Sequence, residues 1–325
     1  MDQASEFLNA LNSHFFNANK RLFWGYLLTT LLLVALVWFR QKRHVPFLKF
    51  LFPKKVWLHP SAKIDYSVWL INNLVKILVI LPLLFSAAPI AIWLSQSMEA
   101  VFGDIPNVTH NRTIILVSFT LLVFLLDDFS RFFLHWIMHK VPLLWSLHKV
   151  HHSAEVLTPF TVYRLHPLES ALYACRLVLS QGFAIGIGFY LFGHKLALYD
   201  ILGANVFVFL FNLFGSNLRH SHVWLSWGDR IENWFISPAQ HQIHHSNSHA
   251  HYDKNLGAAL SIWDRLFGTF LPASSVTTPL KFGVGEQPHG KLTALYLRPL
   301  FDMYNNLKNG FKSGNTASKQ VHKEG

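Results

Sequence analysis

The sequence predicts an all-α membrane protein. We expect a multi-pass helical bundle with a cytoplasmic, histidine-rich helical cap that holds a di-metal centre. Of the 325 residues, 51% are hydrophobic and only 14% are charged, which is too apolar for an ordinary soluble protein. Several apolar runs approach or exceed the length of a helix that crosses a bilayer. Fourteen of the 20 histidines fall between His135 and His251.

The N-terminal membrane region covers residues 1–112. A first span is predicted near residues 23–39, close to the lower length limit for a membrane helix. The apolar run at 68–94 is predicted to be one tilted or kinked span, because Pro82 and Pro89 interrupt it.

Three later apolar runs decide on which side the histidines lie. The run at 113–134 is a third span, which delivers His135 to the side where it ends. The runs at 172–192 and 196–214 are separated by three residues only, and they predict a tight helical hairpin that returns to the same side. The two histidine-rich halves of the chain can therefore meet.

The formal net charge of +11 comes partly from a basic segment at residues 40–63 that has no acidic residue. Beside an apolar run, such a segment indicates a cytoplasmic loop, and no nucleic-acid partner is expected. The loop can contact anionic lipid headgroups or an acidic electron donor, and the sequence leaves both open. Cys175 is the single cysteine, which excludes an intramolecular disulfide and a cysteine-based zinc site. The basic residues are Arg40, Lys42, Arg43, Lys49, Lys54, Lys55 and Lys63.

The histidines form close-set groups with helical spacing. Residues three or four apart share one helix face, so the members of each group point the same way. Imidazole is a frequent metal ligand, and the number of histidines exceeds what one ion takes, which predicts two metal ions. Imidazole suits iron, zinc, copper and nickel alike. The groups are His135-x-x-x-His139, His148-x-x-His151-His152 and His241-x-x-His244-His245, with His220 and His222 upstream of the last.

On these residues the chain resembles the fatty acid hydroxylase/sterol desaturase superfamily of integral membrane non-haem di-iron enzymes. The resemblance implies a catalytic domain at 113–272, followed by a C-terminal extension at 273–325. The polar end from residue 314 is predicted to be disordered. The matching stretches are 128–139, 144–155, 164–169, 217–222, 237–246 and 253–257, running into 262–269.

The resemblance implies O2-dependent hydroxylation or desaturation of a C–H bond in a sterol, fatty acyl or related lipid. The implied cofactor is a pair of iron ions with O2 as co-substrate, and zinc can take their place in purified protein. Many relatives carry Asn where this chain has His222, so His222 is an additional ligand or a neighbour of the ligands. The implied ligands are His135, His139, His148, His151, His152, His220, His241, His244 and His245. Residues that hold the ligands in place are expected among Asp128, Glu155, His166, Glu169 and Asp253.

Electrons are expected from a separate protein, either cytochrome b5-like or ferredoxin-type with its reductase. The chain has neither a nucleotide-binding fingerprint nor a cysteine set for an iron–sulfur cluster. The sequence argues against two alternatives. A zinc-dependent membrane hydrolase lacks the expected His-Glu-x-x-His motif, and a metal transporter would carry ionisable ligands inside its spans. The host membrane, either a bacterial inner membrane or the endoplasmic reticulum, is left open.

Overall fold

Helices make up almost all the regular structure in the computed structural model, which describes residues 3–41, 44–104, 108–198, 200–201, 204–284 and 290–321. This confirms the predicted all-α fold class. The strands described are two-residue segments, β1 (Asp200–Ile201) and β2 (Ala204–Asn205), which pair antiparallel. The N-terminal half contains α1 (Gln3–Phe16), α2 (Trp24–Arg40), α3 (Phe47–Leu51), α4 (Lys54–Trp57), α5 (Pro60–Val75), the π-helical η1 (Lys76–Ile80), α6 (Leu81–Leu83), α7 (Ala88–Phe102), α8 (Arg112–Lys140) and α9 (Pro142–His152). The second half contains η2 (Pro159–Tyr163), α10 (Pro167–Phe192), η3 (Gly193–Lys195), α11 (Val206–Leu213), η4 (Ser216–His220), α12 (Asp229–Glu232), α13 (Pro238–His244), η5 (His249–His251), α14 (Ile262–Leu266), η6 (Ala273–Ser275) and α15 (Leu292–Val321).

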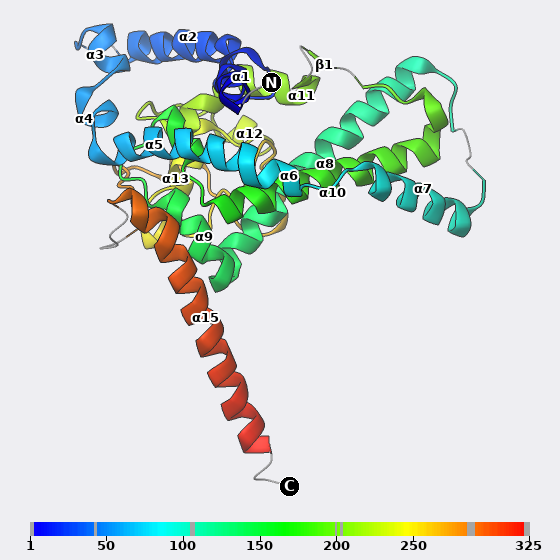
Figure 1. Ribbon diagram of the computed structural model, residues 1–325. Coiled ribbons are helices and arrows are strands. Elements are labelled where there is room, and N and C mark those ends of the chain that lie inside the picture. Colours follow the sequence, from blue (N-terminus) through cyan, green and yellow to red (C-terminus); the bar gives the residue numbers. More distant parts are fainter. Residues whose placement is uncertain are drawn as a thin grey trace.

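Three helices are long and apolar enough to cross a membrane. They are the continuous helix formed by α5, η1 and α6 (Pro60–Leu83), α8 and α10. The predicted first span corresponds to α2, an apolar helix of 17 residues. In Figure 1, α10 runs beside α7 and α8, and all three extend to one side of the molecule.

The prediction of one span at 68–94 is wrong, because the chain forms two helices there. The first ends at Leu83, Leu84 has an extended backbone, and α7 begins at Ala88. Pro89 has no amide hydrogen to donate to the preceding turn, so it starts a new helix instead of continuing the old one. The break therefore lies just before this proline.

The prediction that residues 196–214 form the second helix of a hairpin is also wrong. The first limb is α10, but only α11 is helical in the described part of the return. The Asn205 side chain accepts a hydrogen bond from Phe207 N at 3.0 Å, and this cap fixes the start of α11. The chain nevertheless returns to α8 and α2, which α11 contacts, so the two histidine-rich halves still meet.

A buried apolar cluster attaches the histidine-rich cap to α8. It joins Phe124 of α8, Phe211 of α11, Ile236, Ala259 and Leu260. Burial of apolar surface is the main stabilising contribution to folding. The cluster therefore fixes the segments after α11 against the middle of α8.

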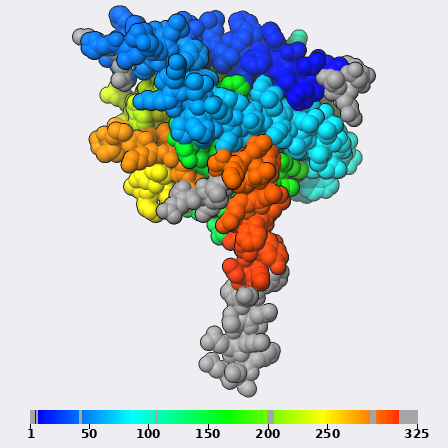
Figure 2. All heavy atoms as spheres, turned by 60° about the vertical axis from the view of Figure 1, so that its left-hand side comes forward, coloured from blue at the N-terminus to red at the C-terminus, as the bar shows by residue number. Residues whose placement is uncertain are grey.

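The chain remains helical to Val321, where the sequence predicted a disordered tail from residue 314. The first turns of α15 pack against α9 and α5, with Leu295 buried. Once nucleated, a helix extends at little cost per residue. Figures 1 and 2 show α15 projecting away from the other helices, and residues 322–325 lie outside the described range.

Glycines on α10 allow α7 to approach closely. A Cβ atom added at Gly182 would lie 2.7 Å from Ile90 Cβ and 3.1 Å from Ala87 O. We expect Gly182→Ala to lower the free energy of unfolding by about 1–3 kcal/mol through overpacking. Thermal unfolding in detergent measures the change. Gly290→Ala is the control, because a Cβ there meets nothing within 4 Å, and an equal loss in both variants would contradict the prediction.

Candidate metal centre

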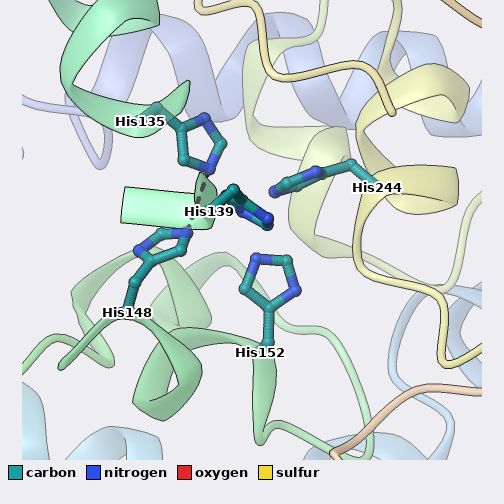
Figure 3. A group of neighbouring side chains, drawn as sticks. All are labelled: His135, His139, His148, His152 and His244. Atoms are coloured by element: carbon teal, nitrogen blue, oxygen red, sulfur yellow. Dashed lines mark hydrogen bonds between the residues drawn. The ribbon is translucent and has the colours of Figure 1, made fainter. Parts of the chain in front are cut away.

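Nine of the ten predicted histidines converge in two buried groups. Within each group the ligand atoms all lie within 4.8 Å of one another. Figure 3 shows the rings of the first group turned toward a common centre. The first group is His135, His139, His148, His152 and His244. The second group is His151, His220, His241 and His245.

Adjacent histidines are divided between the groups. His151 and His245 belong to the second group, whereas His152 and His244 belong to the first. Consecutive residues on an α-helix point about 100° apart, so one helix serves two centres. α9 and α13 each do this, because each contributes histidines to both groups.

Local sequence fixes where these short helices begin. α9 starts with Pro142 and α13 with Pro238, both in the first turn, where proline is favoured. Ser237 Oγ also accepts a hydrogen bond from Gln240 N, and Ser237 N donates to Gln240 Oε1. This capping box sets the start of α13 and thus the direction of its histidines.

In the first group, four rings donate Nδ1–H to an oxygen outside the group. Each bond holds the ring so that Nε2 faces the centre, as in metal sites with oriented histidines. The bonds are His135 to Leu256 O (2.8 Å), His139 to Asp253 Oδ1 (3.2 Å), His148 to Glu169 Oε1 (2.7 Å) and His244 to Lys254 O (3.0 Å).

The inward nitrogens of the first group fit a metal ion. Nε2 of His139, His152 and His244 is buried and has no hydrogen-bond partner, a costly arrangement unless a ligand completes it. His135 Nε2 and His148 Nε2 lie 3.0 Å apart. Two nitrogens bound at about 2.1 Å to one ion lie about 3.0 Å apart at a right angle and about 3.4 Å apart at the tetrahedral angle.

The second group has the same spacing. Nε2 of His220 lies 3.2 Å from that of His151, 3.1 Å from that of His245 and 3.2 Å from that of His241. Neutral rings that meet nitrogen to nitrogen share one proton at most, so one nitrogen cannot satisfy three partners by hydrogen bonding. A shared metal ion satisfies all four.

Burial keeps these imidazoles neutral and able to bind metal. It lowers the pKa of His148 and of His151 to about 3. Loss of hydration disfavours the charged form, so the lone pair needed by a metal is free at neutral pH. Burial, followed by the charges of neighbouring side chains, also holds the pKa well below its usual range in His152, His220, His241, His244 and His245.

His222, the tenth predicted ligand, lies in neither group. Its Nε2–H donates to Phe50 O at 2.7 Å, and the two rings meet edge to face. Burial lowers its pKa. The contact ties α3 to the segment that follows His220, so His222 joins the basic segment to the metal centre and does not face it.

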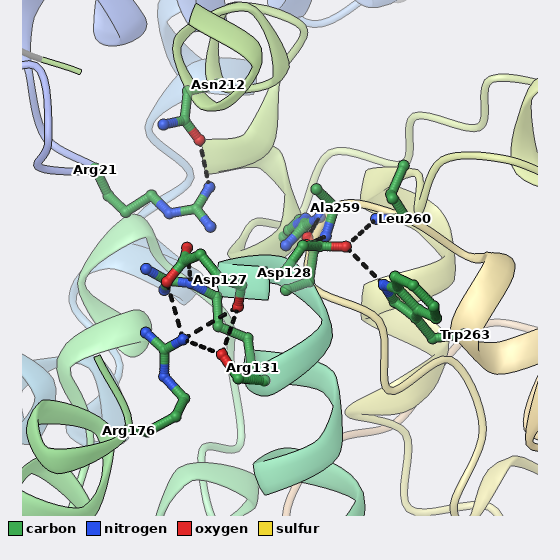
Figure 4. A network of polar contacts seen from close by, with 12 residues as sticks. Arg21, Asp127, Asp128, Arg131, Arg176, Asn212, Ala259, Leu260 and Trp263 are labelled. Carbon is green, nitrogen blue, oxygen red and sulfur yellow. Dashed lines mark hydrogen bonds and ion pairs between the residues drawn. The ribbon is translucent and has the colours of Figure 1, made fainter. Parts of the chain in front are cut away.

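Asp128 contacts none of the nine histidines, contrary to the prediction. Its carboxylate accepts from Ala259 N at 2.7 Å, Leu260 N at 3.1 Å and Trp263 Nε1 at 2.9 Å, as Figure 4 shows. A carboxylate on α8 thus holds the loop before α14. Asp128 and His135 lie on the same helix, as predicted, but the Asp128 carboxylate binds the loop at Ala259 and Leu260 in place of a histidine ring.

Two further predictions differ from the structure. Glu155 is exposed, and its carboxylate lies 3.8 Å from His59 Nε2. His166 caps α10 by accepting from Leu168 N and donates Nε2–H to Tyr296 O. Glu169 and Asp253 are the predicted residues that reach ring nitrogens of the groups.

Two backbone carbonyls that orient the first group were not predicted. The loop carrying Lys254 O and Leu256 O has left-handed residues at Asp253 and Asn255, a conformation that Asp and Asn tolerate. Asp264 accepts hydrogen bonds from Leu256 N and the next amide, and burial raises its pKa to about 6. The signal available in the sequence was Asp253 and Asn255 shortly before Gly257, because Asp and Asn tolerate a left-handed backbone.

Together these features describe a helical membrane protein with two buried histidine groups that can hold two metal ions. Residues 120–269, a little under half of the chain, match the family model described as fatty acid hydroxylase. The family resemblance carried by the histidine groups is thereby confirmed.

Curated relatives carry names of lipid oxidoreductases. Alkylglycerol monooxygenase of Danio rerio is 33% identical over 47% of this chain and 30% of its own length. Ornithine lipid hydroxylase OlsE of Rhizobium tropici is 31% identical over 44% of this chain and 39% of its own. Lathosterol oxidase of Rattus norvegicus is 24% identical over 65% and 60%. The chain thus matches less than a third of the alkylglycerol monooxygenases' length, and no solved structure matches.

Proposed function

We propose that the chain is a membrane-bound, O2-dependent oxidoreductase that hydroxylates or desaturates a C–H bond of a sterol, fatty acyl or related lipid. The observation that carries the proposal is the convergence of nine imidazoles in two buried groups, with inward Nε2 atoms 3.0–3.2 Å apart. The names of the relatives, a monooxygenase, a hydroxylase and an oxidase, support the same reaction class.

The nine histidines are the proposed ligands, and two iron ions are the proposed cofactor. Iron supplies the reaction with O2, which no protein side chain provides. The protein's part is to fix the ligands. Glu169, Asp253 and two backbone carbonyls hold the Nδ1 atoms, and burial keeps the imidazoles neutral. His222 is left out because Phe50 O engages its ring.

The metal centre is proposed to face the cytoplasm. The described basic residues from Arg40 to Lys63 are exposed, among them Lys49 and Lys54. His222 holds the middle of this segment, at Phe50, beside His220 of the second group. Positive loops stay on the cytoplasmic side of a membrane, so a segment joined to the metal centre supports placing both on that side.

Electrons are proposed to come from a separate cytochrome b5-like or ferredoxin-type donor. The exposed lysines on α3 and α4 form a basic surface close to the second group through the His222 contact. An acidic donor would be attracted to such a surface. Loss of electron transfer at high ionic strength, with lipid binding retained, would support this docking.

Metal analysis of the detergent-purified protein tests the function. We expect about two irons per chain, one for each group, because one ion cannot use nine ligands. His244→Ala should remove the iron of the first group, and His241→Ala that of the second. His249→Ala is the matched control, since this exposed histidine belongs to neither group.

The outcome also separates the alternatives. Iron together with O2 consumption and an oxidised lipid product supports the oxidoreductase. Zinc without O2 consumption favours a hydrolase. Metal content that neither variant changes would refute the two-group site.

A further inference from the structure

A cavity of about 550 Å³ borders both histidine groups. Its walls include His135 and His148 of the first group, and His151, His220 and His241 of the second. Its other walls include the segment after α1, the continuous helix from α5 to α6, α8, η2, α10 and η4. A lipid in this cavity would lie against the proposed metals, so its lining bears on which lipid binds.

The lining is strongly cationic. Glu169 is the only carboxylate among the described lining residues, and it accepts a hydrogen bond from His148. Unpaired charges away from bulk water cost free energy. The lining cations are Lys20, Arg21, Lys76, Arg131, Arg176 and Arg219.

Lys20 and Lys76 form a pair of like charges at the cavity. Burial, followed by the nearby Lys76 ammonium, lowers the pKa of Lys20 to about 8. Among the described residues, no carboxylate lies within ion-pair distance of either. Lys76 also opens the π-helical segment η1, and such segments are frequent at functional sites.

The arginines are only partly neutralised. Figure 4 shows Arg131 and Arg176 bound to Asp127, and Arg21 bound to Asn212. The two carboxylate oxygens of Asp127 are occupied by Arg131 Nε at 2.8 Å and Arg176 at 2.9 Å. Arg21 donates to the neutral Asn212 at 2.7 Å and has no described carboxylate partner.

Arg219 adds a buried donor without a partner. Its side chain is 4% exposed, it donates to Ala258 O, and its Nε has no hydrogen-bond partner. Arg219 immediately precedes His220. A positive charge and one unused N–H donor therefore lie directly beside the second group.

We propose that the cavity binds an amphiphile with an anionic headgroup. The headgroup oxygens, of a carboxylate or a phosphate, pair with Lys20, Lys76 and Arg21, which supply the charge-assisted hydrogen bonds such oxygens prefer. The apolar chain of the amphiphile lies along Leu81 and Leu177. Both residues line the cavity, and their exposed fractions are 49% and 36%. This inference rests on the proposed function, because it names the substrate class of that site.

Binding of matched lipids to the purified full chain in neutral detergent tests the proposal. The probes are a long-chain fatty acid, a lysophosphatidic acid and a monoacylglycerol with the same chain. Wild type should bind an anionic probe at least about tenfold more tightly than the monoacylglycerol, the gain expected for one charge-assisted contact. Preference for the fatty acid identifies a carboxylate headgroup, and preference for the lysophosphatidic acid a phosphate.

Two double variants separate charge from shape. Lys20→Gln with Lys76→Gln should weaken binding of the preferred anionic probe by about tenfold or more and leave monoacylglycerol binding unchanged. Lys20→Arg with Lys76→Arg should retain the preference. Lys308→Gln, at an exposed lysine of α15 outside the cavity lining, should change nothing.

Equal binding of neutral and anionic probes by wild type would overturn the proposal, as would equal losses for both probes in the Gln variant. The measurement needs neither an electron donor nor turnover. Anionic lipid that binds selectively but is never oxidised would refute the proposed function and leave the headgroup site standing.

Discussion

Asp65→Asn is expected to lower the free energy of unfolding by about 3–5 kcal/mol, because it removes the charged partner from the buried ion pair with Arg164. Asp65 and Arg164 form an ion pair of 2.7 Å, with side chains 0% and 1% exposed. The second carboxylate oxygen accepts from Thr161 Oγ1 at 2.7 Å. The pair joins α5 to η2, far apart in the sequence.

The same arginine also supports the metal centre. Arg164 Nε donates to Val150 O at 3.1 Å and to Ser153 Oγ at 3.0 Å. These residues flank His151 and His152, one from each group. Disturbing the pair should therefore reduce metal content as well as stability.

Thermal unfolding in detergent, with metal analysis of the same samples, measures both effects. Arg298→Met is the matched control, because it breaks an ion pair whose arginine is 42% exposed and should cost less than about 1 kcal/mol. Asp65→Asn combined with Arg164→Met should recover part of the loss, because the double variant buries neither charge of the pair. Equal effects of Asp65→Asn and Arg298→Met would show that burial does not matter here.

Glu169→Leu is expected to weaken metal binding about 10- to 100-fold, the usual effect of removing a partner of a liganding histidine. Glu169 is fully buried on α10, and its Oε1 lies 2.7 Å from His148 Nδ1. Without an acceptor, His148 can turn or place its proton on Nε2, the nitrogen that faces the group. The ligand is then lost even though the histidine remains.

Metal affinity measured by competition with a chelator tests this role. Glu169→Gln keeps an acceptor oxygen and should lie closer to wild type than Glu169→Leu. Glu155→Gln is the control, because Glu155 is exposed and contacts none of the nine histidines. Metal binding by Glu169→Leu that matches wild type would limit Glu169 to a packing role.

The membership of the candidate site could be predicted from spacing, but its division could not. Intervals of three and four residues identify one helix face, and this brought the histidines of α9 together as a set. Whether His151 or His152 serves a given group depends on where His220 and His244 lie in space. That placement comes from tertiary packing, which one sequence does not display.

The long helices could be predicted where an apolar run of membrane-spanning length forms one continuous helix. Long apolar runs gave α8 and α10, but within the described part of the apolar run at 196–214 the α-helix is only the eight-residue α11. There the Asn205 cap marks the start of α11 at Val206. Backbone acceptors such as Leu256 O are chemically identical at every position, so no residue type marks them.

The hydrogen bonds that orient the first group have a consequence for folding. Their acceptors come from two chain regions far apart in the sequence, Glu169 on α10 and the loop at Asp253 to Leu256. The ligands acquire their orientation only when these regions have assembled. A metal ion that binds the assembled state alone shifts the folding equilibrium toward it by mass action, so metal supply would set how much folded protein a membrane contains.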